Sequence, residues 1–266
     1  MRRRARPLLG TLVEVRADAA EAALDAAFAA VAQVQRLMSF HEAASDVRAL
    51  ARARAGERVR VHAHTAAVLR RAQRWARASG GAFDAGCGAR AVAAGWLPAP
   101  ADAAAPGVLP FEDALLVEGR EVTVRAPVWL DLGGIAKGYA VDRAVAALRR
   151  AGARAGSVNA GGDLRVFGAG EETVFVRSPF DAAQLWPVAA LRDAACATSA
   201  SGAVAVRGGA ARVPAPRSVT VFAPTACAAD ALTKIVWQQG ERARPLLRRA
   251  RAHAFVVGAD GATWRC

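Results

Sequence analysis

The residues best suited to chemistry in this chain are gathered in three short segments. They hold both lysines (Lys137 and Lys234), the single tyrosine (Tyr139) and the single asparagine (Asn159). Only two of the 36 lysines and arginines are lysines, so a retained lysine indicates chemistry or packing that arginine does not satisfy. We therefore predict an active site here, with chance clustering as the alternative. The segments read LDLGGIAKGYAVD (130–142), VNAGGDLR (158–165) and ADALTKIV (229–236).

The first segment is typical of a turn that approaches an anion. We expect a strand that ends at Leu132, a turn at Gly133 and Gly134, and a helix from about Gly138. Glycines let the backbone come close to a ligand, and the amides at a helix start attract anions. Lys137 adds a point charge suited to phosphate. The spacing matches neither a Walker loop nor a dinucleotide-binding fingerprint, and a tight turn with an exposed lysine is the alternative.

The third segment places two oxygen ligands on one helix face. Asp230 and Thr233 are three residues apart, so both oxygens point to the same side. A carboxylate and a hydroxyl suit Mg²⁺, which keeps several waters and bridges to substrate phosphates. The alternative is an aspartate that stabilises the start of its helix through the helix dipole.

The elements that must position these segments mix strands and helices without strict alternation, which favours the α+β class. The patterns predict a strand over 11–16, a helix over 19–38, a helix capped by Thr65 and a hairpin that turns near Gly119. They also predict a strand interrupted by Gly161 and Gly162, and a helix that begins at Thr225 or Ala228 and ends at Gly240. The whole range 1–266 is expected to form one domain.

Composition excludes several classes of protein. No apolar run approaches the roughly 20 residues of a membrane span. The N-terminus carries neither a signal-type apolar core nor a lipid-anchor cysteine, so we expect a cytoplasmic protein. The net charge of +13 comes from scattered arginines without interleaved aromatics, so we expect no nucleic-acid partner. The spacing of the four cysteines suits no zinc site and predicts free, mostly buried thiols.

Eight short motifs in order resemble the FAD:protein FMN transferase family, also called ApbE, and they span residues 8 to 257. The resemblance implies an ApbE-like fold of mixed sheets flanked by helices in a single compact unit. It also implies binding of FAD and Mg²⁺. The motifs are LLGT (8–11), MSFHEAASD (38–46), GGAFD (80–84), DLGGIAKGYAVD (131–142), NAGGDLR (159–165), ATSA (197–200), SVTVFAP (218–224) and ADALT (229–233).

The resemblance assigns roles to positions of this chain. Metal ligands are implied at the backbone carbonyl of Gly134, at Asp230 and at Thr233. His41 stands where many relatives have a stacking tyrosine, and Leu9 replaces a methionine. The positions implied to bind FAD are Leu9, His41, Ala82, Phe83, Asp84, Asp131 and Lys137.

Three departures from the family pattern bear on the chemistry. The family usually has threonine four residues after the helix aspartate, where this chain has Lys234; either Thr233 still reaches the metal or Lys234 supplies charge in place of a metal. The segment 202–217 lacks the histidine that relatives carry as a candidate general base, and the loss of a general base typically costs about 10²–10⁴ in rate. Ala51 replaces a usual asparagine.

The expected function is Mg²⁺-dependent transfer of FMN from FAD to a threonine of a target protein, with release of AMP. Asp163 and Lys234 are the catalytic candidates, and Asp163, Asp131 or solvent is the candidate base. The acceptor is expected in a flavin-bearing redox complex, and relatives are often exported or lipid-anchored. The alternatives are a flavin-nucleotide-binding protein without transferase activity and a hydrolase that splits FAD into FMN and AMP.

Overall fold

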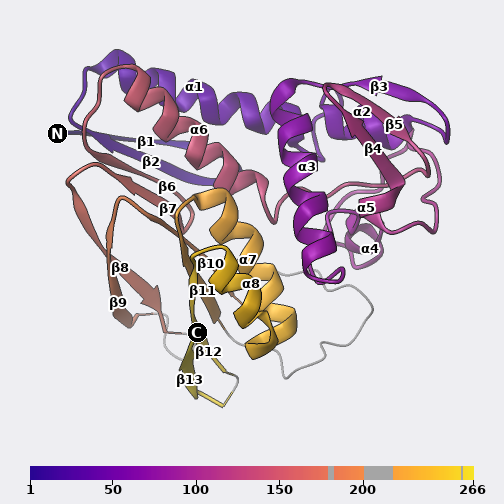
Figure 1. Cartoon of the computed structure of the whole chain (residues 1–266). Helices are drawn as coiled ribbons and strands as arrows, with labels where there is room; N and C mark the ends of the chain where they lie inside the picture. The colour runs from indigo at the N-terminus through magenta and orange to yellow at the C-terminus, as the bar shows by residue number, and fades with distance from the viewer. Residues whose placement is uncertain (179–182, 201–217, 259) are drawn as a thin grey trace. The chain divides into compact units, whose positions relative to one another are not determined.

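The computed structural model describes residues 1–178, 183–200, 218–258 and 260–266. Helices and strands mix without strict alternation (Figure 1), which confirms the α+β class. The contacts within the chain group it into two compact units. The first comprises Met1–Ala32 and most of the chain from Lys137 to Cys266, and the second comprises Gln33–Ala136.

An antiparallel sheet is the framework of the first unit (Figure 1). Its order in the described residues is β1-β2-β6-β7-β10-β11-β12-β13. A separate antiparallel pair is formed by β8 (Glu171–Arg177) and β9 (Leu185–Arg192). The strands of the larger sheet are β1 (Arg2–Leu8), β2 (Thr11–Ala17), β6 (Gly156–Ala160), β7 (Asp163–Phe167), β10 (Ala195–Ala200), β11 (Ser218–Ala223), β12 (His253–Val257) and β13 (Thr263–Arg265).

Helices that pack on the large sheet complete this unit's core. The helix α7 packs on β7, β10 and β11 and buries Leu232, Ile235 and Val236 completely. It starts after Thr225 and ends at Gly240, as the sequence predicts. The helices with residues in this unit are α1 (Glu21–Met38), α6 (Ala136–Arg150), α7 (Ala226–Gln239), the 3₁₀ turn η1 (Gly240–Ala243) and α8 (Arg244–Arg249).

Two tight turns lie at the same end of the large sheet. Leu9 and Gly10 join β1 to β2 with positive φ angles of 57° and 70°. The sequence prediction of one interrupted strand at 157–168 is wrong, because Gly161 and Gly162 instead turn the chain back as a β6–β7 hairpin. Their φ angles of 62° and 101° suit glycine. The register of β2 against β6 places both turns at the same end of the strands.

The second unit is built around α3 and a small antiparallel sheet of order β3-β5-β4. The predicted hairpin at Gly119 is confirmed. Thr65 does not cap α3: His62 is the N-cap, and the Thr65 hydroxyl donates to Asp46. The elements of this unit are α2 (Asp46–Arg52), β3 (Arg58–Arg60), α3 (Ala63–Ala78), α4 (Gly88–Ala93), α5 (Phe111–Ala114), β4 (Leu115–Glu118) and β5 (Glu121–Val124).

The segment that leads to Gly133 differs from its prediction. Residues 127–132 form no regular strand, although the backbone N–H of Asp131 donates to the Ala85 carbonyl at 2.8 Å. The helix α6 starts at Ala136, two residues before the predicted start. An apolar run between a turn and a helix resembles a strand in sequence, but here it follows an irregular path through the second unit's core.

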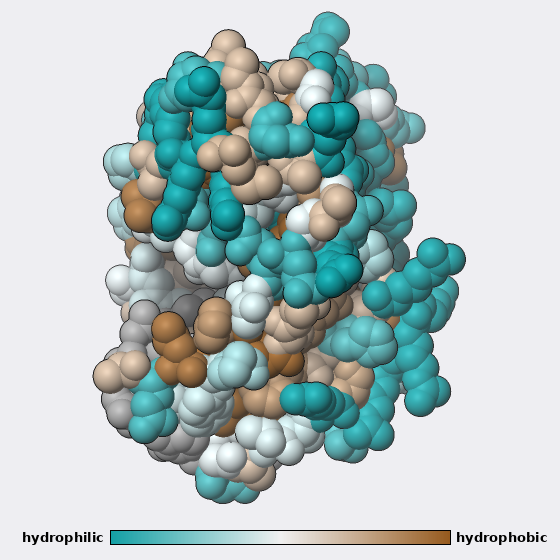
Figure 2. Space-filling model, turned by 90° about the vertical axis from the view of Figure 1, so that its left-hand side faces the viewer, coloured by the Kyte–Doolittle hydropathy of each residue, from teal (hydrophilic) through white to brown (hydrophobic). Residues whose placement is uncertain are grey.

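Many surface arginines are paired with carboxylates. Figure 2 shows hydrophilic side chains spread over one face with apolar ones between them. Arg4 and Arg6 both contact Asp25, and Arg16 contacts Glu172. The four cysteines are free and three are buried, as predicted. Among the described helices, none combines the length and the apolar character that crossing a membrane requires.

We predict that Gly138→Ala strongly destabilises the first unit. A Cβ at Gly138 would lie 2.2 Å from the Ala226 carbonyl oxygen and 2.9 Å from the Asp230 Cβ, so α6 and α7 would have to move apart. The expected loss in unfolding free energy is about 1–3 kcal/mol or more, measured by urea denaturation. The control is Gly170→Ala, where a Cβ meets open space; equal losses in both variants would contradict this.

Candidate active site

Two side chains accept hydrogen bonds from the first backbone amides of α7. The Asp142 carboxylate on α6 accepts the N–H groups of Ala226 and Cys227 at 3.1 and 3.0 Å. The Thr225 hydroxyl accepts the N–H of Ala228 at 3.3 Å. These bonds satisfy amides that a helix start otherwise leaves unpaired, so α7 is fixed against α6 and its polar residues are placed accurately.

Four charged side chains form a cluster inside the first unit. Lys137 Nζ on α6 lies 2.8 Å from Asp163 Oδ2, at the start of β7, and 3.7 Å from Asp230 Oδ1 on α7. Lys234 Nζ lies 3.2 Å from the same Asp230 oxygen. Asp230 Oδ2 accepts the Gly138 N–H at 3.2 Å. Two carboxylates and two ammonium groups therefore meet where α6, α7 and β7 come together; we call them the Lys–Asp cluster.

Burial and charge set the protonation of this cluster. Burial raises the pKa of Asp230, but Lys137 and Lys234 outweigh it and hold that pKa below its ordinary value. Burial and the nearby Asp230 charge raise the pKa of Asp163 to about 7, against the opposing effect of Lys137. Burial lowers the pKa of Lys137, but the two carboxylates outweigh it and raise that pKa. Near neutral pH Lys137 thus stays charged and Asp230 stays ionised.

Hydroxyl groups complete the environment of Lys234. Its Nζ donates to Ser199 Oγ on β10 at 2.7 Å and to Thr233 Oγ1 at 2.9 Å. The two hydroxyl oxygens are 2.8 Å apart, and Thr233 Oγ1 donates to the Asp230 carbonyl at 2.7 Å. The Lys234 side chain is 19% exposed and the Lys137 side chain 32%, so both lysine side chains are partly accessible to solvent.

The sequence resemblance implies Mg²⁺ at the oxygens of this cluster. Within the described residues, no group of three or more His, Cys, Asp or Glu side chains is arranged to hold a metal ion. Asp230 Oδ1 and Thr233 Oγ1, the two side-chain oxygens predicted for the metal, both contact Lys234 Nζ. As they lie, they bind an ammonium group and do not fit a divalent cation.

The predicted flavin residues of the second unit are engaged locally. Asp131 Oδ1 accepts the Gly133 N–H at 2.8 Å, and Gly134 follows in the same turn. Asp84 accepts the Gly86 N–H at 2.8 Å and pairs with Arg90 at 2.7 Å. Phe83 is 3% exposed and belongs to this unit's core, whereas His41 is exposed.

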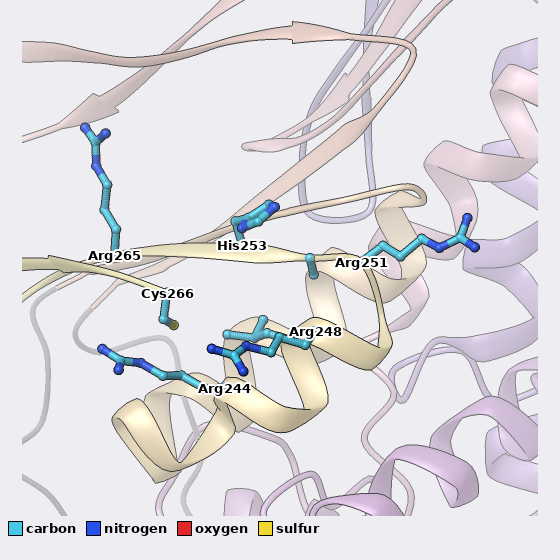
Figure 3. Close-up of a pocket in the computed structure, with 8 residues that line it drawn as sticks. Arg244, Arg248, Arg251, His253, Arg265 and Cys266 are labelled. Atoms are coloured by element: carbon cyan, nitrogen blue, oxygen red, sulfur yellow. The ribbon is translucent and has the colours of Figure 1, made fainter.

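A second basic feature of the first unit is a cavity of about 620 Å³ around α8, β12 and β13. Figure 3 shows Arg244 and Arg248 near the C-terminal Cys266. Arg244 also pairs with Glu241 at 2.8 Å. The cavity is lined by Arg244, Leu247, Arg248, Arg251, Ala252, His253, Arg265 and Cys266, and the residues predicted to bind FAD or metal are not among them.

Comparison with known proteins identifies the family. The model of the ApbE family matches residues 9–256. The chain belongs to the ApbE family. Among solved structures, the ApbE protein of Thermotoga maritima has 25% identity and a TM-score of 0.83, with 99% of this chain and 96% of that chain covered. No protein of curated function matches the sequence significantly.

Two further solved ApbE structures share the fold. The apo flavinyl transferase ApbE of Pseudomonas stutzeri has 19% identity and a TM-score of 0.82, with 99% of this chain and 94% of that chain covered. The flavin transferase ApbE of Vibrio cholerae has 20% identity and a TM-score of 0.81, with 100% and 96% covered. At these identities the likeness shows the ApbE fold.

The ApbE-family chain distributes its predicted site residues over both units. In the first unit, Lys137, Asp163, Asp230, Thr233 and Lys234 come together, and the Leu9 turn lies at the sheet end where β7 begins. The metal role of Gly134 and its predicted meeting with Asp230 stay predictions. The predicted residues of the second unit are His41, Ala82, Phe83, Asp84, Asp131 and Gly134.

Two residues with clear roles were not singled out from the sequence. Ser199 lies in the ATSA motif but received no function, and it binds Lys234 directly. Asp142 ends the 130–142 segment, pairs with Arg165 and caps α7. Both residues belong to motifs of the sequence, which indicated that they could have a function. Only the fold shows that β10 and α6 bring them to α7.

The raised pKa of Asp163 predicts a pH-dependent contribution to stability. The native carboxyl keeps its proton up to about pH 7, whereas the unfolded one loses it near its ordinary value of 3.8. Between these values the native state binds more protons, so this contribution is full below about pH 4 and is lost as pH rises through 7. Asn cannot ionise, so the unfolding free energy of wild type minus that of Asp163→Asn should fall across this window. Urea denaturation at several pH values measures it, and a difference that grows with pH refutes it.

Proposed function

We propose that this chain transfers FMN from FAD to a threonine hydroxyl of a partner protein and releases AMP. The observation that carries this is the Lys–Asp cluster, which brings together two partly exposed lysine side chains. Lys137 stands at a position that the resemblance assigns to the flavin nucleotide, and Lys234 lies next to Asp230, which it assigns to the metal. Solved relatives named flavin transferases support the reaction class. The family implies an acceptor in a flavin-bearing redox complex.

The reaction balances without any oxidant or reductant. The threonine oxygen attacks the phosphorus on the FMN side of the FAD pyrophosphate and forms a phosphoester bond. The bond from that phosphorus to the bridging oxygen breaks, and AMP leaves with that oxygen. The hydroxyl proton passes to a base. Phosphoryl transfer of this kind is catalysed mainly by positioning and by stabilising charge on the leaving oxygens.

The lysines are suited to that electrostatic task. Negative charge that builds on the AMP oxygens needs fixed positive groups within hydrogen-bond reach, in a site with little water. Lys137 and Lys234 are held by buried carboxylates, so their ammonium groups need little rearrangement when the phosphates arrive. Gly10 and the Gly161–Gly162 pair form tight turns at the end of the large sheet where β7 begins. Glycine at such positions permits close approach of a ligand.

Asp163 is better suited to holding Lys137 than to accepting the hydroxyl proton. Its side chain is 2% exposed and already bonded to Lys137. Asp131 is the other acidic candidate, and it is more exposed. The segment 202–217, in which relatives carry a candidate base, lies outside the described residues. We therefore assign Asp163 a positioning role and leave proton acceptance to Asp131 or water.

The alternatives keep the same flavin nucleotide but omit the protein acceptor. A hydrolase would use water in place of threonine and would release both FMN and AMP. A binding protein would hold FAD and release neither. The absence of His and Asp from the sequence 202–217 is the observation that supports these alternatives, so the acceptor must be included in the assay.

The deciding experiment incubates the protein with FAD and a threonine-containing flavinylation-site peptide, with Mg²⁺ and with EDTA in parallel. Mass spectrometry is expected to show a gain that matches FMN on the peptide, with one AMP released per peptide labelled. Release of FMN and AMP without labelling would identify a hydrolase. FAD retained intact under both conditions would identify a binding protein.

We predict that Lys137→Met slows AMP release by about 10²–10³, the typical effect of removing one group that stabilises charge in the transition state. The control is Arg150→Met, which removes an exposed cation from the end of the same helix and should leave the rate unchanged. Circular dichroism verifies that both variants are folded. A normal rate in folded Lys137→Met would remove Lys137 from the mechanism.

A further inference from the structure

The Lys234 ammonium group lies in a pocket made of oxygens. It has three N–H donors, and three side-chain oxygens are within 3.2 Å: Ser199 Oγ, Thr233 Oγ1 and Asp230 Oδ1. These oxygens are buried, because Asp230 and Thr233 are 0% exposed and Ser199 is 4% exposed. Each N–H donor of Lys234 therefore has its own acceptor, and each acceptor belongs to a residue of α7 or β10.

These are the oxygens with which a divalent cation would have to bind. Asp230 Oδ1 and Thr233 Oγ1 are the side-chain ligands implied for the family's metal, and Lys234 occupies the place where the family usually has a threonine. Mg²⁺ requires about six oxygens at 2.0–2.1 Å. A dication at Asp230 Oδ1 would also lie next to the charged Lys234 Nζ, which contacts the same atom.

The cluster carries no net negative charge that a metal would have to neutralise. Asp163 and Asp230 contribute up to two negative charges, and Lys137 and Lys234 contribute two positive ones. Addition of Mg²⁺ would leave the buried site with excess positive charge. Both lysines of the chain belong to this cluster. An ammonium group is a compact point charge, as a metal ion is, whereas a guanidinium group is a planar fork.

We propose that Lys234 Nζ permanently takes the place of the divalent cation, so that this ApbE-family protein binds FAD and acts on its pyrophosphate without a metal. The inference rests on the proposed function, because it names the group that faces the phosphates in that reaction. One hydroxyl would then give up its hydrogen bond, and Lys234 would donate to a pyrophosphate oxygen while Asp230 and the other hydroxyl hold it. Lys234, a catalytic candidate from the sequence, would thus act as a built-in cation.

The test measures metal binding directly and separately from activity. Mn²⁺ is titrated into the protein with FAD present and followed by electron paramagnetic resonance, and FAD affinity is measured by fluorescence with Mg²⁺ and with EDTA. For the wild type we expect no Mn²⁺ binding below millimolar concentrations, and FAD Kd values that agree within about twofold. Tight Mn²⁺ binding, or loss of FAD in EDTA, overturns the inference.

The variant Lys234→Thr restores the family's threonine and vacates the oxygens. We expect its Mn²⁺ affinity to rise at least tenfold and its FAD affinity to depend on the metal. The control is Arg150→Thr, which makes the same charge change on an exposed position of α6 and should gain no Mn²⁺ affinity. A folded Lys234→Thr variant that gains none refutes the substitution of lysine for metal; if it fails to fold, the wild-type measurements decide.

Failure of the proposed function gives a different result. If FAD is bound but neither AMP nor labelled peptide forms in any condition, transfer is refuted while the metal measurements still decide the role of Lys234. If AMP forms in wild type only when Mg²⁺ is present, transfer or hydrolysis stands and the built-in cation is refuted.

Discussion

The arrangement of the first unit depends on one buried carboxylate, that of Asp230. Its side chain is inaccessible to solvent, and a buried charge is tolerated only when it is paired and hydrogen-bonded. Lys137, Lys234 and the Gly138 N–H supply that compensation from two helices. Removing one partner of such a buried pair typically costs about 3–5 kcal/mol. The carboxylate therefore fixes the distance between α6 and α7 as well as the positions of both ammonium groups.

Asp142 also holds the same two helices together. It caps the first amides of α7 and pairs with Arg165 of β7, so a single side chain joins both helices and the sheet. Gly138 permits the close approach, because the Ala226 carbonyl lies against its α-carbon. A helix N-terminus with free amides would attract a phosphate, but at α7 these amides are already bonded. In the proposed reaction, the lysines would attract the phosphates instead.

The sequence predicted those parts of the fold that depend on local pattern. The helix α7 with its ends at Thr225 and Gly240, the strand β2 and the hairpin at Gly119 follow from periodicity and from turn residues. Strands that pair over long range were harder, because glycines in the middle of an apolar run indicate either a bulge or a turn. The same ambiguity hid the β6–β7 hairpin, and it gave a strand where residues before Gly133 follow an irregular path.

The sequence indicated which residues lie in the site better than it indicated how they contact one another. Asp230 and Thr233 were correctly expected on one helix face, but their partner is Lys234, four residues from Asp230, which folds back over that face. Residues three and four apart on a helix share a face, so ADALTK contains both a carboxylate–hydroxyl pair and a carboxylate–ammonium pair. Which of them dominates depends on Ser199 of β10, because its hydroxyl provides the third acceptor of the ammonium group. That contact joins residues 35 positions apart, and only the folded sheet brings them together.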